Sequence, residues 1–278
     1  MASTNKKPTL IFSPGAWHTG ASFKPTTDAL TKEGFKCIAL DLPTIGSELK
    51  GLSPPQDWNP DVEHIHAAIL HELDEEGVDV VLVVHSYSGT VGSEACKGLD
   101  QQTRRAEGKN TCVKAMVYLS GMVLDNGGCN WEATDGKPID ESRTIMKVRS
   151  FYSPSNFVKV GGIDSLQGDL CYATGDTEAW FYNECSPSAV VLAQSQLQSH
   201  AWKAFLSKPT YTAWRHIPSW YLHCTNDQAV PFEVQKVMVG YEGGKWTTRV
   251  CDADHSPMIS RVGDVVGIIK EAVEASEE

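Results

Sequence analysis

Short, almost uninterrupted runs of apolar residues recur along this chain, and stretches with helical periodicity separate them. Inner strands of a parallel β-sheet are covered by helices on both faces, so they consist almost entirely of apolar residues. Six strands are predicted, at 9–13, 36–40, 79–84, 113–119, 219–224 and 245–251, and several of them are runs of this kind. The spacers predict helices at 21–33, 61–76, 88–105, 231–242 and 261–275. We therefore expect an α/β protein with a mostly parallel central sheet flanked by helices.

The alternation of strands and helices stops between residues 122 and 212. This segment is rich in aromatic side chains and contains the glycine pairs 127–128 and 161–162. About 90 residues is too long for one unstructured loop in a compact domain. We therefore predict that residues 122–212 form an inserted, mainly helical cap (lid), and that residues 1–121 and 213–278 form the α/β core.

Charge and hydropathy exclude several classes of function. The 278 residues carry a formal net charge of −11, and no run of lysine or arginine exceeds a pair, so no nucleic-acid partner is expected. The longest apolar runs are strand-sized and far below the roughly 20 residues that cross a bilayer, so no membrane association is expected. No apolar signal-like segment precedes the first strand, and we expect a cytoplasmic protein.

The eight cysteines are expected to be free thiols. None is spaced in the CxxC or CxxH patterns of zinc sites, and free thiols are usual in a reducing compartment. His64 and His66 lack a companion set of ligands, so no metal is expected there. The sequence also contains no phosphate-binding loop and no dinucleotide-binding fingerprint. The chain is therefore expected to need no cofactor and no metal.

A serine follows the third expected strand. The strand at 79–84 leads into the turn 85–89, which contains Ser86, and then into a helix. This order is typical of a nucleophile elbow, in which a strained backbone exposes the serine hydroxyl. The consensus Gly-x-Ser-x-Gly is not met, because Val84 and Ser88 occupy its outer positions. A serine at such a place can also be a turn or cap residue, so its surroundings have to decide.

An acid and a histidine follow later strands in the same way. Asp227 comes just after the strand at 219–224, and His255 comes just after the strand at 245–251. The carboxyl ends of parallel strands lie at one edge of the sheet, where open α/β sheets bind their ligands. We therefore expect Ser86 to be the nucleophile and His255 the general base. Asp227 is expected to orient the imidazole and to stabilise its charged form.

A glycine-containing turn after the first strand is expected to complete the site. Acyl transfer needs two backbone N–H groups that converge on the developing negative charge, an oxyanion hole. The amides of Ala16, in this turn, and of Tyr87 are the candidates. Candidate substrate-binding side chains are Trp17, His18, Trp131, Trp180 and Phe181. Each of these also suits the apolar core of the cap, and the sequence leaves that alternative open.

These motifs resemble the small-cap branch of the α/β-hydrolase family, which includes plant salicylate and jasmonate methyl esterases, hydroxynitrile lyases, and bacterial and fungal relatives. The motifs are Gly15-Ala16-Trp17-His18, His85-Ser86-Tyr87, Asp227 with Pro231, Asp254-His255-Ser256-Pro257-Met258, and the segments 179–185 and 212–218. The resemblance spans residues 8–275 and implies the α/β-hydrolase fold with a triad in the order Ser, Asp, His.

Two departures from this branch bear on the expected activity. Pro14 stands where the plant enzymes commonly have a histidine before the glycine of the turn. Ser256 follows His255, whereas hydroxynitrile lyases have a lysine there, so a cyanohydrin lyase is disfavoured.

The combined expectation is a serine hydrolase that cleaves a carboxylic ester or lactone of a small to mid-sized apolar or aromatic metabolite through an acyl-enzyme. Two alternatives stay open. One is a lyase, isomerase or cyclase of specialised metabolism that uses the same site, and the other is a ligand receptor with an idle triad. The expected partner is the small-molecule substrate, and a homodimer is left open.

Overall fold

Six strands form one parallel sheet in the computed structural model, which describes residues 6–125, 128–130, 169–173 and 176–277. The strand order is β2-β1-β3-β4-β7-β8, and every neighbouring pair is parallel. The strands are β1 (Thr9–Ser13), β2 (Cys37–Ala39), β3 (Val80–His85), β4 (Val113–Leu119), β7 (Ser219–Cys224) and β8 (Trp246–Cys251). All six expected strands are confirmed, and each observed end lies within one residue of the predicted one.

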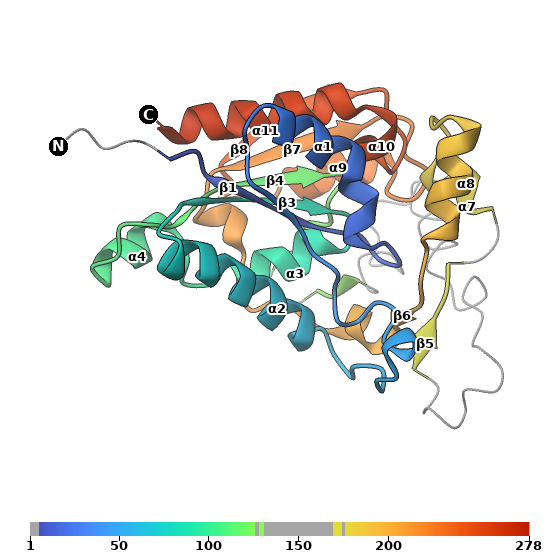
Figure 1. The fold of residues 1–278 in the computed structure, drawn as a ribbon, viewed down its shortest axis with the longest axis horizontal. Coiled ribbons are helices and arrows are strands. Elements are labelled where there is room, and N and C mark those ends of the chain that lie inside the picture. The colour runs from blue at the N-terminus through green and yellow to red at the C-terminus, as the bar shows by residue number, and fades with distance from the viewer. Residues whose placement is uncertain (1–5, 126–127, 131–168, 174–175, 278) are drawn as a thin grey trace.

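Helices cover both faces of the sheet (Figure 1). One face is covered by α1 (Lys24–Lys32) and α11 (Val262–Glu277), and the other by α2 (Asn59–Leu70), α3 (Ser88–Ala95) and α9 (Phe232–Val239). Successive side chains of a strand point to opposite faces, so β3 contributes to both layers. Val81 and Val83 lie in the core beneath α11, whereas Leu82 and Val84 lie in the core beneath α2. All four are fully buried, which explains the uninterrupted apolar run.

The helix expected at 88–105 is wrong as a single element. The structure has two helices there, because α3 ends at Ala95 and α4 (Gln101–Ala106) begins after a turn. Gly98 lies between them with a φ of 80°, a left-handed conformation that favours glycine. A right-handed helix cannot continue through this residue. The side chain of Asp100 then caps α4 by accepting a hydrogen bond from the backbone N–H of Thr103 at 3.0 Å.

The described residues between β4 and β7 contain both helices and a short sheet. The helices are α7 (Thr177–Phe181) and α8 (Pro187–Ser195), and the antiparallel pair is β5 (Leu170–Cys171) with β6 (His200–Ala201). Figure 1 shows α7 and α8 beyond the carboxyl ends of the parallel strands, where ligand sites of such sheets lie. The division into a core and a cap at residues 122 and 212 stays a prediction.

Shorter helical elements connect the main helices and strands. The four-residue α10 (Pro257–Ser260) directly precedes α11, and 3-10 turns occupy Gly20–Phe23 and Ala213–Arg215. The loop between β8 and α10 is therefore short and held at both ends. This loop contains His255.

Candidate active site

Ser86 lies in the sharp turn between β3 and α3, with a left-handed φ of 50°. This conformation costs a non-glycine residue about 1–3 kcal/mol and persists only where the surroundings enforce it. The carbonyl oxygen of Ser86 accepts hydrogen bonds from the amides of Gly89 (2.9 Å) and Met122 (2.8 Å). A Cβ on Gly89 would lie 2.2 Å from the Met122 carbonyl oxygen, so glycine is required at this contact. The turn is thus fixed from two sides.

The two departures from the elbow consensus are accommodated by neighbouring residues. Val84 packs against Gly92 of α3, where an added Cβ would lie 2.6 Å from Val84 Cγ1. The hydroxyl of Ser88 donates to the carbonyl oxygen of Pro14 and lies 2.8 Å from the hydroxyl of Ser13. Gly92 therefore provides the close approach of helix and strand, and Ser88 ties the elbow to the end of β1.

Ser86, Asp227 and His255 meet at the carboxyl edge of the sheet. His255 Nε2 lies 3.0 Å from Ser86 Oγ, and His255 Nδ1 lies 2.8 Å from Asp227 Oδ2. All three residues are at most 3% exposed. With the imidazole proton on Nδ1, the carboxylate accepts from Nδ1–H and the serine hydroxyl donates to Nε2. This is the arrangement in which a histidine can remove the serine proton.

The carboxylate of Asp227 is held by several donors. Its Oδ1 accepts hydrogen bonds from the amides of Ala229 (2.7 Å) and Val230 (2.8 Å). Its Oδ2 accepts a further bond from the hydroxyl of Ser120, just after β4, and lies 3.4 Å from Gln235 Nε2. Donors of this kind stabilise an ionised carboxylate and fix its direction. Sequence reasoning assigned no role to Ser120 or Gln235.

The backbone of His255 is held from the sheet by His85, the last residue of β3. The carbonyl oxygen of His255 accepts a hydrogen bond from His85 Nε2–H at 2.7 Å, and the two ring centroids are 4.8 Å apart. Burial, followed by the neighbouring His255, holds the pKa of His85 well below its ordinary value. A neutral His85 therefore acts as a structural donor behind the base, a role that the sequence motif did not reveal.

The turn after β1 lies directly against the elbow. A Cβ on Gly15 would lie 2.9 Å from Ser86 Cβ and 2.7 Å from His85 Nδ1, so this approach also requires glycine. Within the described part of the chain, neither the amide of Ala16 nor that of Tyr87 donates a hydrogen bond to a protein acceptor. An oxyanion hole requires amides that are not engaged in this way, and the assignment of Ala16 and Tyr87 to one stays a prediction.

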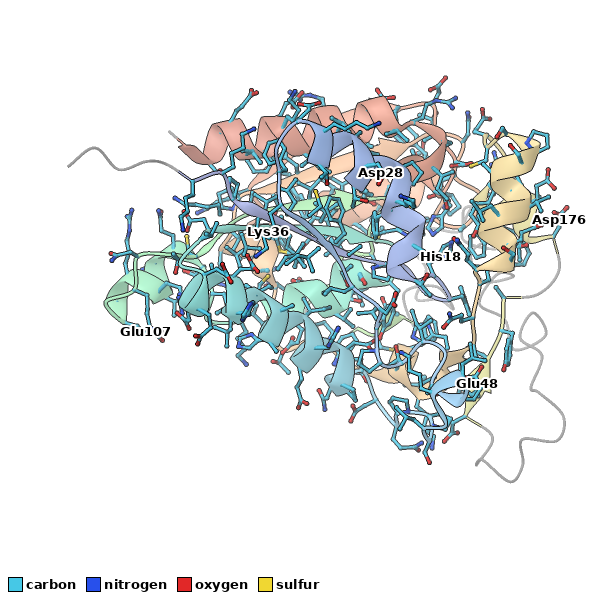
Figure 2. The ribbon with its side chains drawn as sticks, viewed as in Figure 1. His18, Asp28, Lys36, Glu48, Glu107 and Asp176 are labelled. Atoms are coloured by element: carbon cyan, nitrogen blue, oxygen red, sulfur yellow. The ribbon has the colours of Figure 1, made fainter. Side chains whose placement is uncertain are left out.

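His18 links this turn to the segment that follows α7. The hydroxyl of Tyr182 donates to His18 Nε2 at 2.8 Å, and His18 Nδ1–H donates to the carbonyl oxygen of Ala16 at 2.8 Å. Figure 2 shows His18 between the sheet and the α7–α8 segment. Burial lowers the pKa of His18 to about 4, so the ring is neutral at pH 7 and can accept the tyrosine proton.

The side chain of Tyr87 points into the core and anchors the elbow. Its hydroxyl donates to Asp61 Oδ2 at 3.0 Å, and the same carboxylate accepts from the amide (2.9 Å) and hydroxyl (2.6 Å) of Thr44. The Thr44 hydroxyl also lies 3.0 Å from His200 Nε2. Burial raises the pKa of Asp61 to about 6. Sequence reasoning missed this buried polar cluster, although Asp61 was expected in the first turn of its helix.

The expected pocket residues differ in their placement. Phe181 lies next to the imidazole of His255, with 5.6 Å between the two ring centroids. Trp17 is 2% exposed and packs against Phe181 at 6.1 Å between centroids, within the core. Trp180 is partly buried and packs against the same core. Trp131 lies outside the described residues.

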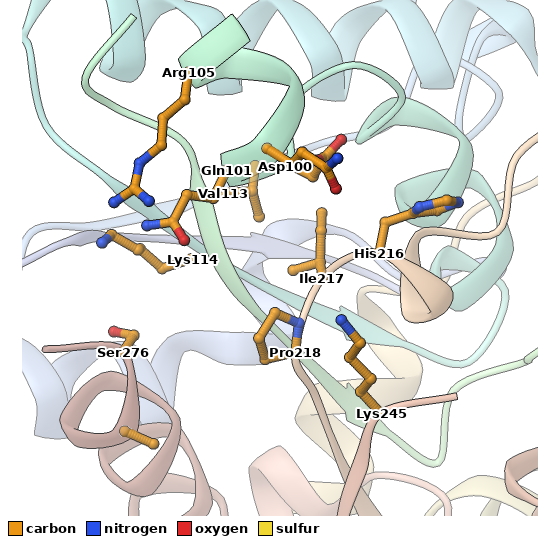
Figure 3. Close-up of a pocket in the computed structure, with 12 residues that line it drawn as sticks. Asp100, Gln101, Arg105, Val113, Lys114, His216, Ile217, Pro218, Lys245 and Ser276 are labelled. Carbon is orange, nitrogen blue, oxygen red and sulfur yellow. The ribbon is translucent and has the colours of Figure 1, made fainter. Parts of the chain in front are cut away.

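A cavity of about 610 Å³ opens at the opposite edge of the sheet (Figure 3). Its wall is formed near the starts of β4 and β8 and the end of α11, with side chains that include Arg105, Lys114, His216, Lys245 and Ser276. None of the residues that meet around Ser86 contributes to it, so this cavity is separate from the candidate active site.

Two further findings concern membrane spanning and metal binding in the part of the chain that the structure describes. There, no helix combines the length and apolarity needed to span a membrane. In the same residues, no group of three or more His, Cys, Asp or Glu side chains is arranged to hold a metal ion.

Comparison with known proteins identifies the family. A profile of the alpha/beta hydrolase family matches residues 10–268. The chain is 33% identical over 267 residues to the alpha/beta hydrolase nvfD of Aspergillus novofumigatus (strain IBT 16806), covering 96% of both chains.

Two solved structures share the fold. A pyrethroid hydrolase from Sphingobium faniae JZ-2 matches with a TM-score of 0.74 and 18% identity, covering 96% of this chain and 98% of that one. Methylesterase MES16 from Arabidopsis matches with a TM-score of 0.70 and 18% identity, covering 96% and 99%. Together with the family profile and the parallel sheet, these matches lead to one conclusion: this chain belongs to the alpha/beta hydrolase family.

Proposed function

We propose that this protein is a serine hydrolase that cleaves a carboxylic ester or lactone of a small to mid-sized apolar or aromatic metabolite. One observation carries the proposal: a single buried imidazole, that of His255, bridges the Ser86 hydroxyl at 3.0 Å and the Asp227 carboxylate at 2.8 Å. Activation of a serine hydroxyl needs a base within hydrogen-bond reach and a third group that orients the base. Both requirements are met here.

The first half of the reaction forms an acyl-enzyme. His255 Nε2 accepts the proton of Ser86 as Oγ attacks the substrate carbonyl carbon, and Asp227 stabilises the resulting imidazolium. The amides of Ala16 and Tyr87 donate to the carbonyl oxygen as it gains negative charge. Removal of one such donor in other enzymes costs roughly 10²–10³-fold in rate. His255 then gives its proton to the leaving alcohol.

The second half regenerates the enzyme. His255 accepts a proton from a water molecule that attacks the acyl carbon, and the acid is released as Ser86 Oγ regains a proton. A lactone follows the same steps, except that its alcohol stays covalently joined to the acyl group, so hydrolysis releases a single hydroxy acid. No cofactor or metal is needed for any step.

The surroundings of the triad favour an apolar substrate. Phe181 covers the His255 ring, and Trp17 packs behind Phe181, so the protein surface next to the base is aromatic. The names of similar proteins agree with ester chemistry, since they include a methylesterase and a pyrethroid hydrolase. The proposal also includes a cap formed by residues 122–212, a small molecule as the partner, and a cytoplasmic location.

Substitution of the nucleophile tests the proposal. Ser86→Ala should abolish turnover of a p-nitrophenyl ester and prevent covalent labelling by a fluorophosphonate probe. Ser276→Ala, a serine on α11 at the opposite edge of the sheet, serves as the control and should label as the wild type does. Labelling that persists in Ser86→Ala would remove Ser86 from this role.

The same assay separates the two alternative functions. A lyase, isomerase or cyclase that uses His255 for acid–base chemistry forms no acylated serine during turnover. A receptor with an idle triad is stabilised by its ligand without turnover. Acylation of Ser86 together with release of the acid is expected only from the hydrolase.

A further inference from the structure

Residues 182–185, which follow α7, contact the loops that carry the active site; we call them the clasp segment. Tyr182 donates to His18 in the turn after β1, at 2.8 Å. Asn183 Nδ2 donates to the carbonyl oxygen of Asn226, one residue before the catalytic acid, at 3.1 Å. The clasp segment therefore contacts both the turn after β1 and the loop that carries Asp227 through side-chain hydrogen bonds.

The third contact of the clasp segment is with Asp254, the residue before the base. Asp254 Oδ2 accepts hydrogen bonds from the amide of Glu184 at 3.0 Å and from the thiol of Cys185 at 3.3 Å. Asp254 Oδ1 accepts from the amide of Ser256 at 3.0 Å and from the hydroxyl of Ser260 at 2.7 Å. Oδ2 thus binds the clasp segment, whereas Oδ1 binds the loop that carries His255 and the following α10.

Asp254 is fully buried, which makes these four bonds significant. A buried carboxylate is strongly destabilising unless donors surround it. The bonds from Ser256 and Ser260 are an ordinary local turn and would explain an acid that only shapes its own loop. The local turn does not explain the two hydrogen bonds of Oδ2, because their donors come from a segment about 70 residues earlier in the chain.

His255 is consequently held from both sides of its peptide backbone. On one side, His85 Nε2–H donates to its carbonyl oxygen at 2.7 Å. On the other side, the preceding residue Asp254 is bound to the clasp segment. The imidazole itself spans 3.0 Å to Ser86 and 2.8 Å to Asp227, a geometry that small shifts of the loop would degrade.

We propose that Asp254 is a positioning residue through which docking of the clasp segment aligns His255 for proton transfer from Ser86. This inference rests on the proposed function, because it takes His255 to be the general base. The residue just before the clasp segment is Phe181, whose ring lies over His255, so one docking event both covers the base and fixes its loop.

The test uses Asp254→Asn, a substitution of equal size. The amide oxygen can replace Oδ1 and keep its two local bonds, whereas the amide nitrogen replaces Oδ2 and places a donor opposite the Glu184 amide. Misalignment of a catalytic group by about 1 Å can cost 10²-fold. We expect the second-order rate of fluorophosphonate labelling at Ser86 to fall by about 10- to 100-fold. In ester hydrolysis, kcat should fall more than KM rises.

A neighbouring acid provides the matched control. Asp252 lies two residues earlier in the same loop, is largely exposed, and pairs with Arg261 at 2.8 Å. Asp252→Asn removes an acid of the same loop and leaves in place the four bonds of Asp254 and the 3.4 Å contact of Arg261 with Glu184, so its labelling rate should equal that of the wild type. A folded Asp254→Asn protein that labels at the wild-type rate would overturn the proposal.

A second pair of variants decides the question if Asp254→Asn does not fold. Cys185→Ala removes one donor from Oδ2, and Ser260→Ala removes one donor from Oδ1. The proposal predicts slower labelling in Cys185→Ala and wild-type labelling in Ser260→Ala. Equal effects of the two variants would mean that Asp254 has only a structural role.

Alkylation of Cys185 reports the contact without any enzymatic activity. Burial, followed by the Asp254 carboxylate, raises the pKa of the Cys185 thiol, so loss of that charge should make the thiol more reactive. We expect iodoacetamide to modify the Cys185 peptide at least several-fold faster in Asp254→Asn than in Asp252→Asn. An unchanged rate contradicts the contact. A wild type that takes no fluorophosphonate contradicts the proposed function instead.

Discussion

Asp227, one of the three residues proposed for catalysis, has a carboxylate that is held by several hydrogen bonds. Two backbone amides and the Ser120 hydroxyl fix its carboxylate, so that one oxygen faces His255 Nδ1. The carboxylate therefore selects the imidazole tautomer in which Nε2 can accept the Ser86 proton. This selection depends on the charge and on the acceptor character of Oδ2.

Asp227→Asn should lower kcat by about 10³–10⁴-fold with little loss of folded protein. The amide nitrogen would donate to the imidazole and favour the tautomer with its proton on Nε2, which cannot accept from Ser86. Initial rates with a p-nitrophenyl ester measure the effect. Asp28→Asn, an exposed acid on α1, is the control. Activity within tenfold of the wild type would contradict the assigned role.

The candidate triad could be predicted from sequence because each member lies shortly after the end of an expected strand. Parallel strands end at one edge, so the three positions converge without knowledge of their contacts. The supporting residues could not be found in this way. His85 and Asp254 were noted only as neighbours of Ser86 and His255, since their partners lie 170 and about 70 residues away in the chain.

At the scale of elements, the strands were predicted more accurately than the helices. A strand that is buried on both faces is apolar throughout. This pattern can be recognised in the sequence without knowledge of the tertiary contacts. The helix expected at 88–105 failed because only a short turn separates α3 from α4 along the chain. The break is marked by Gly98 and the capping Asp100, which are a C-terminal and an N-terminal signal in close succession.

Two glycines on helices should respond oppositely to alanine. In α11, a Cβ at Gly267 meets nothing within 4 Å, so Gly267→Ala should stabilise the protein by about 0.5–1 kcal/mol through helix propensity. In α3, Gly89→Ala would place a Cβ 2.2 Å from the Met122 carbonyl oxygen and should destabilise the elbow strongly. Urea unfolding of both variants measures the difference. Equal stabilities would contradict the packing described for the elbow.

At the scale of the whole molecule, a buried acid makes stability depend on pH. The ordinary pKa of Asp61 is 3.8, whereas burial raises it to about 6 in the folded protein. Between these values the folded protein binds more protons than the unfolded chain, so this group's contribution to stability falls as pH rises. The shift corresponds to a destabilisation of the folded protein on the order of 2–3 kcal/mol, which is fully present above pH 6.

Asp61→Asn should remove this dependence, because the amide stays neutral and its oxygen can still accept from the Thr44 amide. The free energy of unfolding of Asp61→Asn minus that of the wild type should therefore increase between pH 4 and pH 7. Urea unfolding at several pH values measures this difference. A difference that is constant across the range would show that Asp61 titrates normally in the folded protein.

The overall arrangement brings loops from both halves of the sequence to one edge of the sheet. The predicted core and cap division follows from the loss of strand–helix alternation at residue 122, and the described α7–α8 segment lies at that same edge (Figure 1). The sequence could not indicate how this segment docks, because its contacts to His18 and Asp254 are a few hydrogen bonds without periodicity.

Detection of the acyl-enzyme tests the central claim most directly. The wild type would be mixed with an aryl ester of a slowly hydrolysed acid, quenched in acid within the first turnover, and analysed by peptide mass spectrometry. The acyl mass is expected on the peptide that contains Ser86, and on no peptide of Ser86→Ala. Release of the aryl alcohol while the Ser86 peptide stays unmodified, or an acyl group on a different residue, would contradict nucleophilic catalysis by Ser86.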